Sequence, residues 1–212
     1  MISKNNFQSQ EDIQLKPAIN GLVLSGGQSL RMGHDKGEIS YHDKTQRRYL
    51  YELLLPYCKA VFISCNDAQS KYIIDMPVIE DRYSNIGPLN GILSAFQSNP
   101  NTAWLTVACD LPFLNKETIG YLIDNRNHSK IATVFYNEEE KFLEPLITIW
   151  EPVANNILLK FLAEGCNSPS KILSKSDVEM IHVPGLMAFK NINTKEEYAE
   201  ALSLLKKSNS HN

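Results

Sequence analysis

The sequence predicts an α/β fold with a mostly parallel central sheet. Apolar runs of strand length alternate with longer segments of helical period, which is the pattern of βα units. The chain has 212 residues, of which 43% are hydrophobic and 21% charged, so it can build one sizeable core. We therefore expect a single domain over residues 17–207, with loose tails at residues 1–16 and 208–212.

The predicted strands are short apolar runs. Residues 19–24 are apolar apart from Asn20 and Gly21, and this run ends at Ser25-Gly26-Gly27. Such a composition favours a strand that is buried on both faces. The full set of predicted strands covers residues 19–24, 60–65, 77–80, 103–109, 131–136, 146–150, 178–183 and 188–192.

The predicted helices lie between these strands and carry recognisable start signals. Proline loses no hydrogen bond at a first helical position, so Gly87-Pro88 is expected to start a helix. Thr194 and Glu197 stand in capping-box register, which supports the start of the last helix. The full set of predicted helices covers residues 46–58, 88–97, 116–125, 153–163 and 194–206.

Composition and charge exclude several classes of protein. With 21 Lys and Arg against 24 Asp and Glu, the formal charge of −3 gives no general reason to expect binding to nucleic acid or an anionic membrane. The uncharged stretch 83–109 is interrupted by Asn and Pro, so we predict no transmembrane helix. Residues 1–16 lack the apolar run of a secretory signal, and the four cysteines lack metal-ligand spacing. We expect a cytoplasmic protein with no zinc site.

The most informative segment is the glycine-rich loop that follows the first strand. Residues 24–36 read Leu-Ser-Gly-Gly-Gln-Ser-Leu-Arg-Met-Gly-His-Asp-Lys. Three glycines let the backbone approach a ligand closely and let N–H groups converge on an anion. Arg31 and Lys36 add two cations, a combination that suits a triphosphate. The loop matches neither a P-loop nor a dinucleotide fingerprint. The alternative interpretation is a plain glycine turn with two solvated cations.

Asp110 stands at the carboxyl end of the strand that is most central in character. Ligands of open α/β sheets bind outside the carboxyl ends of the strands, so Asp110 should face the same crevice as the glycine loop. Magnesium commonly takes only one or two protein carboxylates. We therefore predict Asp110 as a Mg²⁺ ligand; the alternative is a cap for the turn that leads into Leu111-Pro112.

Two further segments carry polar residues that suit a nucleotide. Asp81 can accept hydrogen bonds from a base or ribose, or support the metal, while Gly87 lets its loop pass close to the nucleotide. The alternative is a surface charge and a simple helix start. Asn191 and Asn193 should share one face of a strand and read a polar heterocycle, unless they serve as turn and cap residues. No pattern for a covalent nucleophile is present in the sequence.

These segments, in their order and with Glu144-Pro145-Leu146 between them, resemble the molybdenum cofactor guanylyltransferase family over residues 19–205. The resemblance implies a three-layer Rossmann-like nucleotidyltransferase fold. It also implies that Mg²⁺ assists transfer of GMP from GTP to the phosphate of molybdopterin cofactor, which releases pyrophosphate. No protein nucleophile is needed for this reaction, and transient contact with proteins that supply or receive the cofactor is expected.

The resemblance assigns roles to particular residues of this chain. By position, Leu24, Ser25, Gly26 and Lys36 are implied to bind GTP, and Asp81 and Asp110 to contact the nucleotide, Asp110 together with Mg²⁺. The catalytic candidates are Arg31, Lys36 and Asp110. The polar and glycine-rich segments described above add four further candidates for nucleotide binding: Gly27, Gly87, Asn191 and Asn193.

Two departures from the family pattern concern the acceptor and the first loop. Residues 165–171 replace the family's basic residues, which leaves Lys171 as the candidate substitute. Asp43-Lys44-Thr45 stands in place of a Gly-x-Pro turn. Gly26-Gly27 stands where cytidylyl relatives have Ala-Gly, so the resemblance implies guanine rather than cytosine. The alternatives are a cytidylyl- or sugar-phosphate nucleotidyltransferase on the same scaffold, and a non-catalytic adaptor that binds nucleotide or cofactor.

Overall fold

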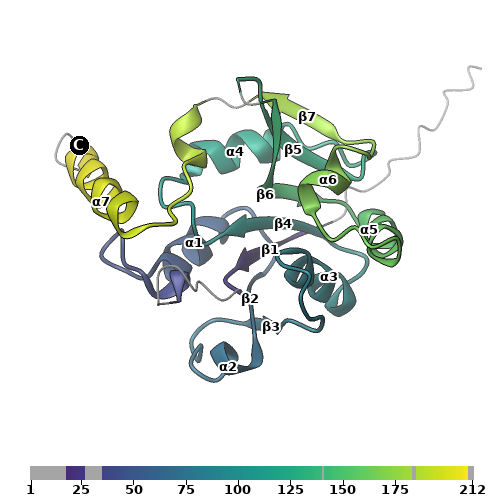
Figure 1. Ribbon diagram of the computed structural model, residues 1–212, viewed down its shortest axis with the longest axis horizontal. Helices are drawn as coiled ribbons and strands as arrows, with labels where there is room; N and C mark the ends of the chain where they lie inside the picture. Colours follow the sequence, from purple (N-terminus) through teal and green to yellow (C-terminus); the bar gives the residue numbers. More distant parts are fainter. Residues whose placement is uncertain (1–17, 27–34, 140, 183–184, 210–212) are drawn as a thin grey trace, which may run out of the picture.

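The computed structural model describes residues 18–26, 35–139, 141–182 and 185–209, which are built around one seven-stranded sheet (Figure 1). The strand order is β3-β2-β1-β4-β6-β5-β7. β6 runs antiparallel to its neighbours β4 and β5, and the other neighbouring pairs are parallel. The predicted α/β class with a mostly parallel sheet is therefore confirmed. The strands are β1 (Ile19–Leu24), β2 (Val61–Cys65), β3 (Val78–Glu80), β4 (Ala103–Ala108), β5 (Ala132–Asn137), β6 (Phe142–Trp150) and β7 (Glu179–His182).

Helices cover both faces of this sheet, which gives three layers. α1 (Gln46–Leu54) and α4 (Lys116–Asp124) contribute to one buried apolar cluster. α3 (Leu89–Ser98), α5 (Ala154–Ala163) and α6 (Pro169–Leu173) contribute to a second cluster. Two of the remaining helices are α2 (Asp67–Ser70) and the 3₁₀ helix η1 (Lys36–Glu38). The other two are the 3₁₀ helix η2 (Leu186–Phe189) and α7 (Lys195–Asn209).

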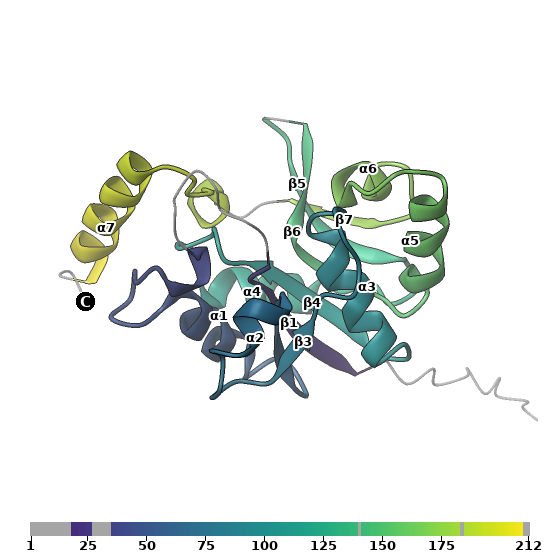
Figure 2. The same cartoon turned by 60° about the horizontal axis from the view of Figure 1, so that its bottom comes forward.

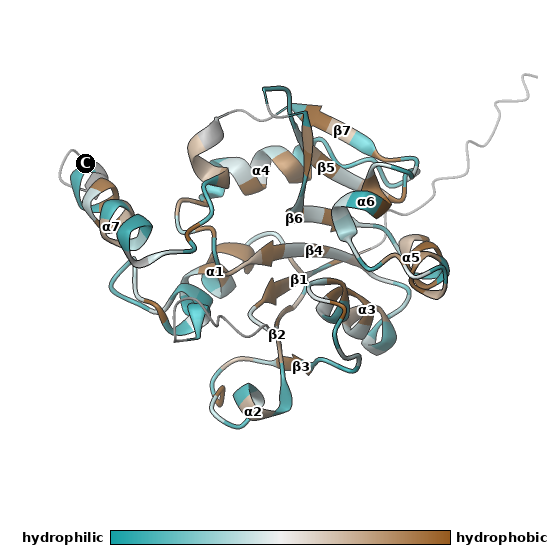
Figure 3. Cartoon of the chain, in the orientation of Figure 1, coloured by the Kyte–Doolittle hydropathy of each residue, from teal (hydrophilic) through white to brown (hydrophobic). Residues whose placement is uncertain are grey.

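β1 and β4 are buried on both faces, as the unbroken apolar run of β1 predicts. Val23 of β1 belongs to the cluster with α1, whereas Leu22 and Leu24 belong to the cluster with α3. β4 alternates in the same way, with Leu105 on one side and Trp104 on the other. Figure 3 shows apolar residues on these middle strands, between the two helical layers. Alternation between two cores removes the usual polar face of a strand.

α7 lies at the same end of the molecule as η1 in both views (Figures 1 and 2). A third, small apolar cluster holds it there through Ala201, Ile192 and Tyr41. The rings of Tyr41 and Tyr198 meet edge to face at 5.2 Å. The predicted capping box is confirmed: Thr194 accepts from the Glu197 amide and Glu197 accepts from the Thr194 amide. The final helix thus packs against the segment that follows η1.

Some predicted boundaries are wrong for identifiable reasons. The strand predicted at 188–192 is absent: η2 occupies its start, and Ile192 donates its amide to the Asp110 carbonyl instead of to a strand. β6 begins at Phe142 rather than 146, because the hairpin with β5 extends it. α1 ends at Leu54 rather than at 58, and α3 begins one residue after the predicted start. α2 and α6 escaped prediction because one turn is too short to show helical period.

The described chain contains no helix that is both long and apolar enough to cross a membrane. The predicted N-terminal tail, residues 1–16, lies outside the described residues. α7 continues to Asn209, past the predicted end of the domain at 207.

A buried ion pair far from the glycine loop offers a test of this fold. Arg126 Nε and Nη2 donate to Glu151 at 2.6 and 2.8 Å, and the two side chains are 6% and 1% exposed. We predict that Arg126→Met lowers the free energy of unfolding by about 3–5 kcal/mol, because a buried carboxylate loses its countercharge. Urea denaturation measures this. The matched control is Lys130→Met, whose partner Asp177 is exposed, and it should lose only a small fraction of that amount. Equal losses in the two variants would contradict the prediction.

Candidate active site

The carboxyl ends of four parallel strands meet at one edge of the sheet. Ser25 and Gly26 follow β1, Asp81 follows β3 and Asp110 lies just past β4. β1 and β4 pair in register, with Leu24 opposite Ala108. Ligands of open α/β sheets bind at this edge, so the fold places Ser25, Gly26 and the predicted carboxylates where binding is expected.

Lys36 and Asp110 are neighbours in space, as the sequence analysis predicts. The Lys36 Nζ lies 3.6 Å from Asp110 Oδ2 and donates to Asn193 Oδ1 at 2.6 Å. Lys36 opens η1, directly after the glycine loop, whereas Asn193 lies just before α7. One ammonium group thus joins three segments that are far apart in the sequence.

Asp110 is a largely buried carboxylate with spare hydrogen-bonding capacity. Its side chain is 19% exposed, and its Oδ1 is buried without a hydrogen-bond partner among the described residues. Burial raises the pKa of Asp110, and the nearby Lys36 charge opposes that shift. Buried polar atoms without partners are rare, and one at a binding edge is consistent with a cation ligand.

Asp81 lies against the glycine loop rather than on an open surface. It accepts from Ser64 Oγ at 2.8 Å, and its backbone amide donates to the Cys65 carbonyl at 2.9 Å. A Cβ built on Gly26 would lie 2.5 Å from Asp81 Oδ2, so a larger residue at this position would have to displace the Asp81 carboxyl group. Burial raises the pKa of Asp81, and the Ser64 hydrogen bond opposes this effect.

The other predicted residues fall into three groups. Leu24 packs in the core and Ser25 is buried, so Leu24 can reach a ligand only through its backbone. Gly87 has φ +59°, a left-handed conformation that favours glycine, with open space beside it. Gly27 and Arg31 lie outside the described residues.

Asn191 and Asn193 do not share a strand face, and that prediction is wrong, because the segment is not a strand. Asn193 binds Lys36. Asn191 Oδ1 is buried and has no partner within the described ranges. The Asp110 carbonyl accepts from Ile192, between them, at 2.9 Å. This backbone bond brings both carboxamides to the carboxyl end of β4.

Three side chains that the sequence analysis missed hold the loop after Asp110. His42 Nε2, Gln46 Nε2 and Tyr49 Oη bind the carbonyl groups of Pro112, Leu111 and Leu114 at 2.8, 3.0 and 2.7 Å. The His42 and Tyr49 rings also stack at 3.8 Å. Thr45, where the family's Gly-x-Pro turn is absent, accepts from the Arg48 amide and so caps α1. The signal available in the sequence was the spacing of Gln46 with Leu50 and Leu54, which puts a polar residue on the apolar face of the predicted helix.

Comparison with known protein families assigns this chain to the nucleotidyltransferases. Residues 21–178 match the model of the MobA-like NTP transferase domain family, and the chain belongs to that family. The predicted family and the predicted Rossmann-like fold are both confirmed.

Three relatives illustrate the similarity. A bifunctional molybdenum cofactor biosynthesis protein of Synechocystis sp. is 36% identical over 89% of this chain, which spans only 55% of that protein. A probable molybdenum cofactor guanylyltransferase of Clostridium perfringens is 31% identical over 85% of this chain and 94% of its own length. The crystal structure of molybdopterin-guanine dinucleotide biosynthesis protein A from Archaeoglobus fulgidus superposes with a TM-score of 0.74. It is 22% identical and covers 89% of this chain and 99% of its own, and it supports the fold.

The raised pKa of Asp110 predicts a pH-dependent effect on stability. Because its pKa in the folded protein lies above the usual value of 3.8, ionisation of Asp110 costs stability as the pH rises through the raised pKa. Asp110→Asn removes this cost. We therefore expect the variant to gain stability relative to the parent protein between about pH 4 and pH 7, without added Mg²⁺ or nucleotide. Urea denaturation across this range measures the difference. An advantage that shrinks as the pH rises would contradict the prediction.

Proposed function

We propose that this protein transfers GMP from GTP to the phosphate of molybdopterin cofactor and releases pyrophosphate. The observation that carries the proposal is the placement of Lys36 beside Asp110 at the carboxyl ends of β1 and β4. Membership of the MobA-like family and similarity to the Clostridium perfringens protein over most of its length support the choice of substrates.

Asp110 fits the role of a Mg²⁺ ligand. Its Oδ1 is buried and has no partner in the described part of the chain, and a carboxylate oxygen is the ligand type that magnesium prefers. The described residues hold no cluster of three or more His, Cys, Asp or Glu side chains. Magnesium can be held by one carboxylate with phosphate oxygens and water. Bound there, Mg²⁺ would neutralise negative charge on the phosphates of GTP.

The protein's own residues would bind and orient the two substrates. The attacking phosphate is already anionic, so no side chain has to generate a nucleophile. The amides around Gly26 and the ammonium of Lys36 would bind phosphate oxygens, and Asp81 beside Gly26 would accept hydrogen bonds from the nucleoside. Orientation and charge stabilisation in a partly dry site then account for catalysis. Arg31 is proposed to add a second cation.

The residues that would bind the acceptor, molybdopterin cofactor, remain a prediction. Lys171, the candidate substitute for the family's basic residues, lies in α6, whose Ile172 and Leu173 pack in the cluster with α3. In both views α6 lies on the other side of the molecule from η1 and α7 (Figures 1 and 2). This placement argues against Lys171 as an anchor beside Lys36.

A cytoplasmic location and contact with cofactor-handling proteins are further proposals.

Nucleotide preference can be tested by thermal shift. We predict that GTP with Mg²⁺ raises the melting temperature more than CTP, UTP or ATP at equal concentration, because a ligand of the native state stabilises it by mass action. A ligand at 100 times its dissociation constant contributes about 2.7 kcal/mol. A larger shift with CTP or UTP would instead favour a cytidylyl- or sugar-phosphate nucleotidyltransferase.

Catalysis can be tested by pyrophosphate release in the presence of GTP, Mg²⁺ and molybdopterin cofactor. We predict that Lys36→Ala and Asp110→Ala each lower turnover by about 10²–10³, because each removes a charged group from the reacting centre. Circular dichroism should show an unchanged fold. The control is Lys44→Ala, whose exposed partner is Glu52 and which should keep normal turnover. Normal turnover in both site variants would remove the proposed site, and GTP binding without pyrophosphate release would favour the adaptor.

A further inference from the structure

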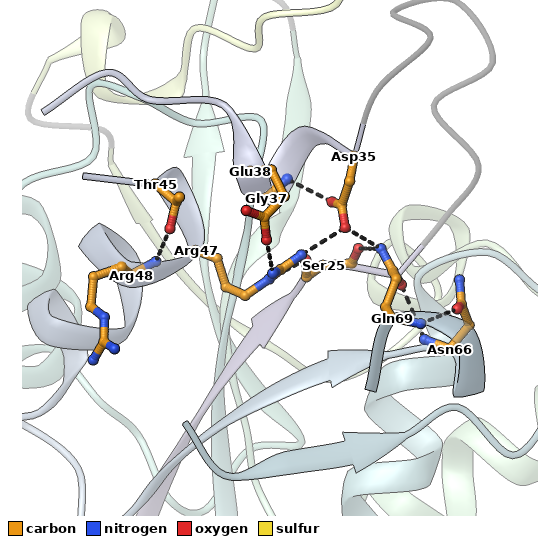
Figure 4. Close-up of polar contacts among 9 residues, drawn as sticks. All are labelled: Ser25, Asp35, Gly37, Glu38, Thr45, Arg47, Arg48, Asn66 and Gln69. Carbon is orange, nitrogen blue, oxygen red and sulfur yellow. Dashed lines mark hydrogen bonds and ion pairs between the residues drawn. The ribbon is translucent and has the colours of Figure 1, made fainter. Parts of the chain in front are cut away.

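Arg47 is a buried cation near the glycine loop to which no role has yet been assigned. It is the second residue of α1 and only 3% exposed. Its Nε donates to Ser25 Oγ at 3.0 Å, its Nη2 pairs with Asp35 Oδ2 at 2.7 Å, and its Nη1 pairs with Glu38 (Figure 4). Ser25 directly precedes the glycine loop, whereas Asp35 and Glu38 follow it. One guanidinium therefore ties together the two ends of the loop.

The backbone of η1 packs directly against this guanidinium. A Cβ built on Gly37 would lie 2.5 Å from Ser25 Oγ and 2.8 Å from Arg47 Nη2. Asp35 caps the same turn by accepting from the Gly37 amide at 2.9 Å. A side chain at residue 37 would therefore have to displace Ser25 Oγ, the guanidinium or η1 itself.

Gln69 forms a second connection between Ser25 and Asp35, on either side of the glycine-rich segment. Its Nε2 donates to the Ser25 carbonyl at 3.1 Å and to Asp35 Oδ2 at 2.7 Å. A capping box with Asn66 at the start of α2 fixes the orientation of Gln69 (Figure 4). The base of the loop is thus connected to α1 and α2 as well as to β1.

The energetics of a buried guanidinium indicate that Arg47 serves to position its neighbours rather than to stabilise the fold. Its desolvation offsets much of the attraction to its partners, so a whole buried ion pair can often be replaced by apolar residues of similar volume without loss of stability. What the arrangement does achieve is a defined place for Lys36, which lies between Asp35 and Glu38. We propose that Arg47 is a positioning residue that sets the distance of Lys36 from Ser25 and Asp110 for nucleotide binding.

This inference rests on the proposed role of Lys36 in binding GTP, so its test separates the two claims. The dissociation constant of GTP with Mg²⁺ is measured by calorimetry for the parent protein, Arg47→Met, Lys36→Ala and the double variant. If Arg47 acts through Lys36, its substitution weakens binding about tenfold in the parent protein and less than about threefold beside Lys36→Ala. A merely structural role would give the same factor in both backgrounds.

The matched control is Arg48→Met. Arg48 is the next residue of α1 and pairs with Asp75 and Glu52, away from the loop, so binding should change less than about twofold. Equal effects of Arg47→Met and Arg48→Met, or additive effects with Lys36→Ala, overturn the inference. Unchanged GTP binding by Lys36→Ala instead overturns the proposed nucleotide site, and the inference with it.

A second variant covers the case in which Arg47→Met does not fold. Gly37→Ala keeps the charge of Arg47 but places a methyl group against Ser25 and the guanidinium, which should displace η1. We expect the same non-additivity with Lys36→Ala. Gly120→Ala in α4 is its control, because a Cβ there would meet Tyr57 only at ordinary contact distance, 3.6 Å. Normal GTP binding by Gly37→Ala would overturn the inference.

Discussion

The parallel pairing of β1 with β4 is the constraint on which the site depends. Leu24 stands opposite Ala108, and the Cys109 amide donates to the Leu24 carbonyl at 3.2 Å. Both strands therefore end at the same level, and the glycine loop leaves the sheet beside Asp110. A shift of one residue in this register would turn every β1 side chain to the other core, so two-sided burial specifies the alignment strongly. Packing of the core thereby positions the chemistry.

Polar groups are buried at this edge in two different ways. Each guanidinium nitrogen of Arg47 has a hydrogen-bond partner, whereas Asp110 keeps one buried oxygen without a partner in the described structure. A satisfied network rigidifies its surroundings, and an unsatisfied oxygen retains capacity for a ligand. The carboxyl edge of the sheet thus combines a rigid base with an open binding position.

The segment 42–49 shows how a departure from a family pattern can be compensated. Without a Gly-x-Pro turn, Thr45 caps α1, and the first turns of that helix direct polar side chains to two places. His42, Gln46 and Tyr49 hold carbonyl groups of the loop after Asp110, and Arg47 holds the end of β1. One helix start therefore connects both halves of the site.

From the sequence by itself, the α/β class, the two-sided burial of β1, the glycine loop and the approach of Lys36 to Asp110 could be predicted. These features follow from local composition and from the rule that parallel strands end at one edge. Only the tertiary structure decided the contacts of Arg47 and Gln69 and the shape of residues 188–193. The Arg47 bond to Ser25 spans 22 residues of sequence, and the Gln69 bonds to Asp35 and Ser25 span 34 and 44. Ile192 likewise donates its amide to the carbonyl of Asp110, which is distant in the sequence, and no local periodicity encodes such long-range contacts.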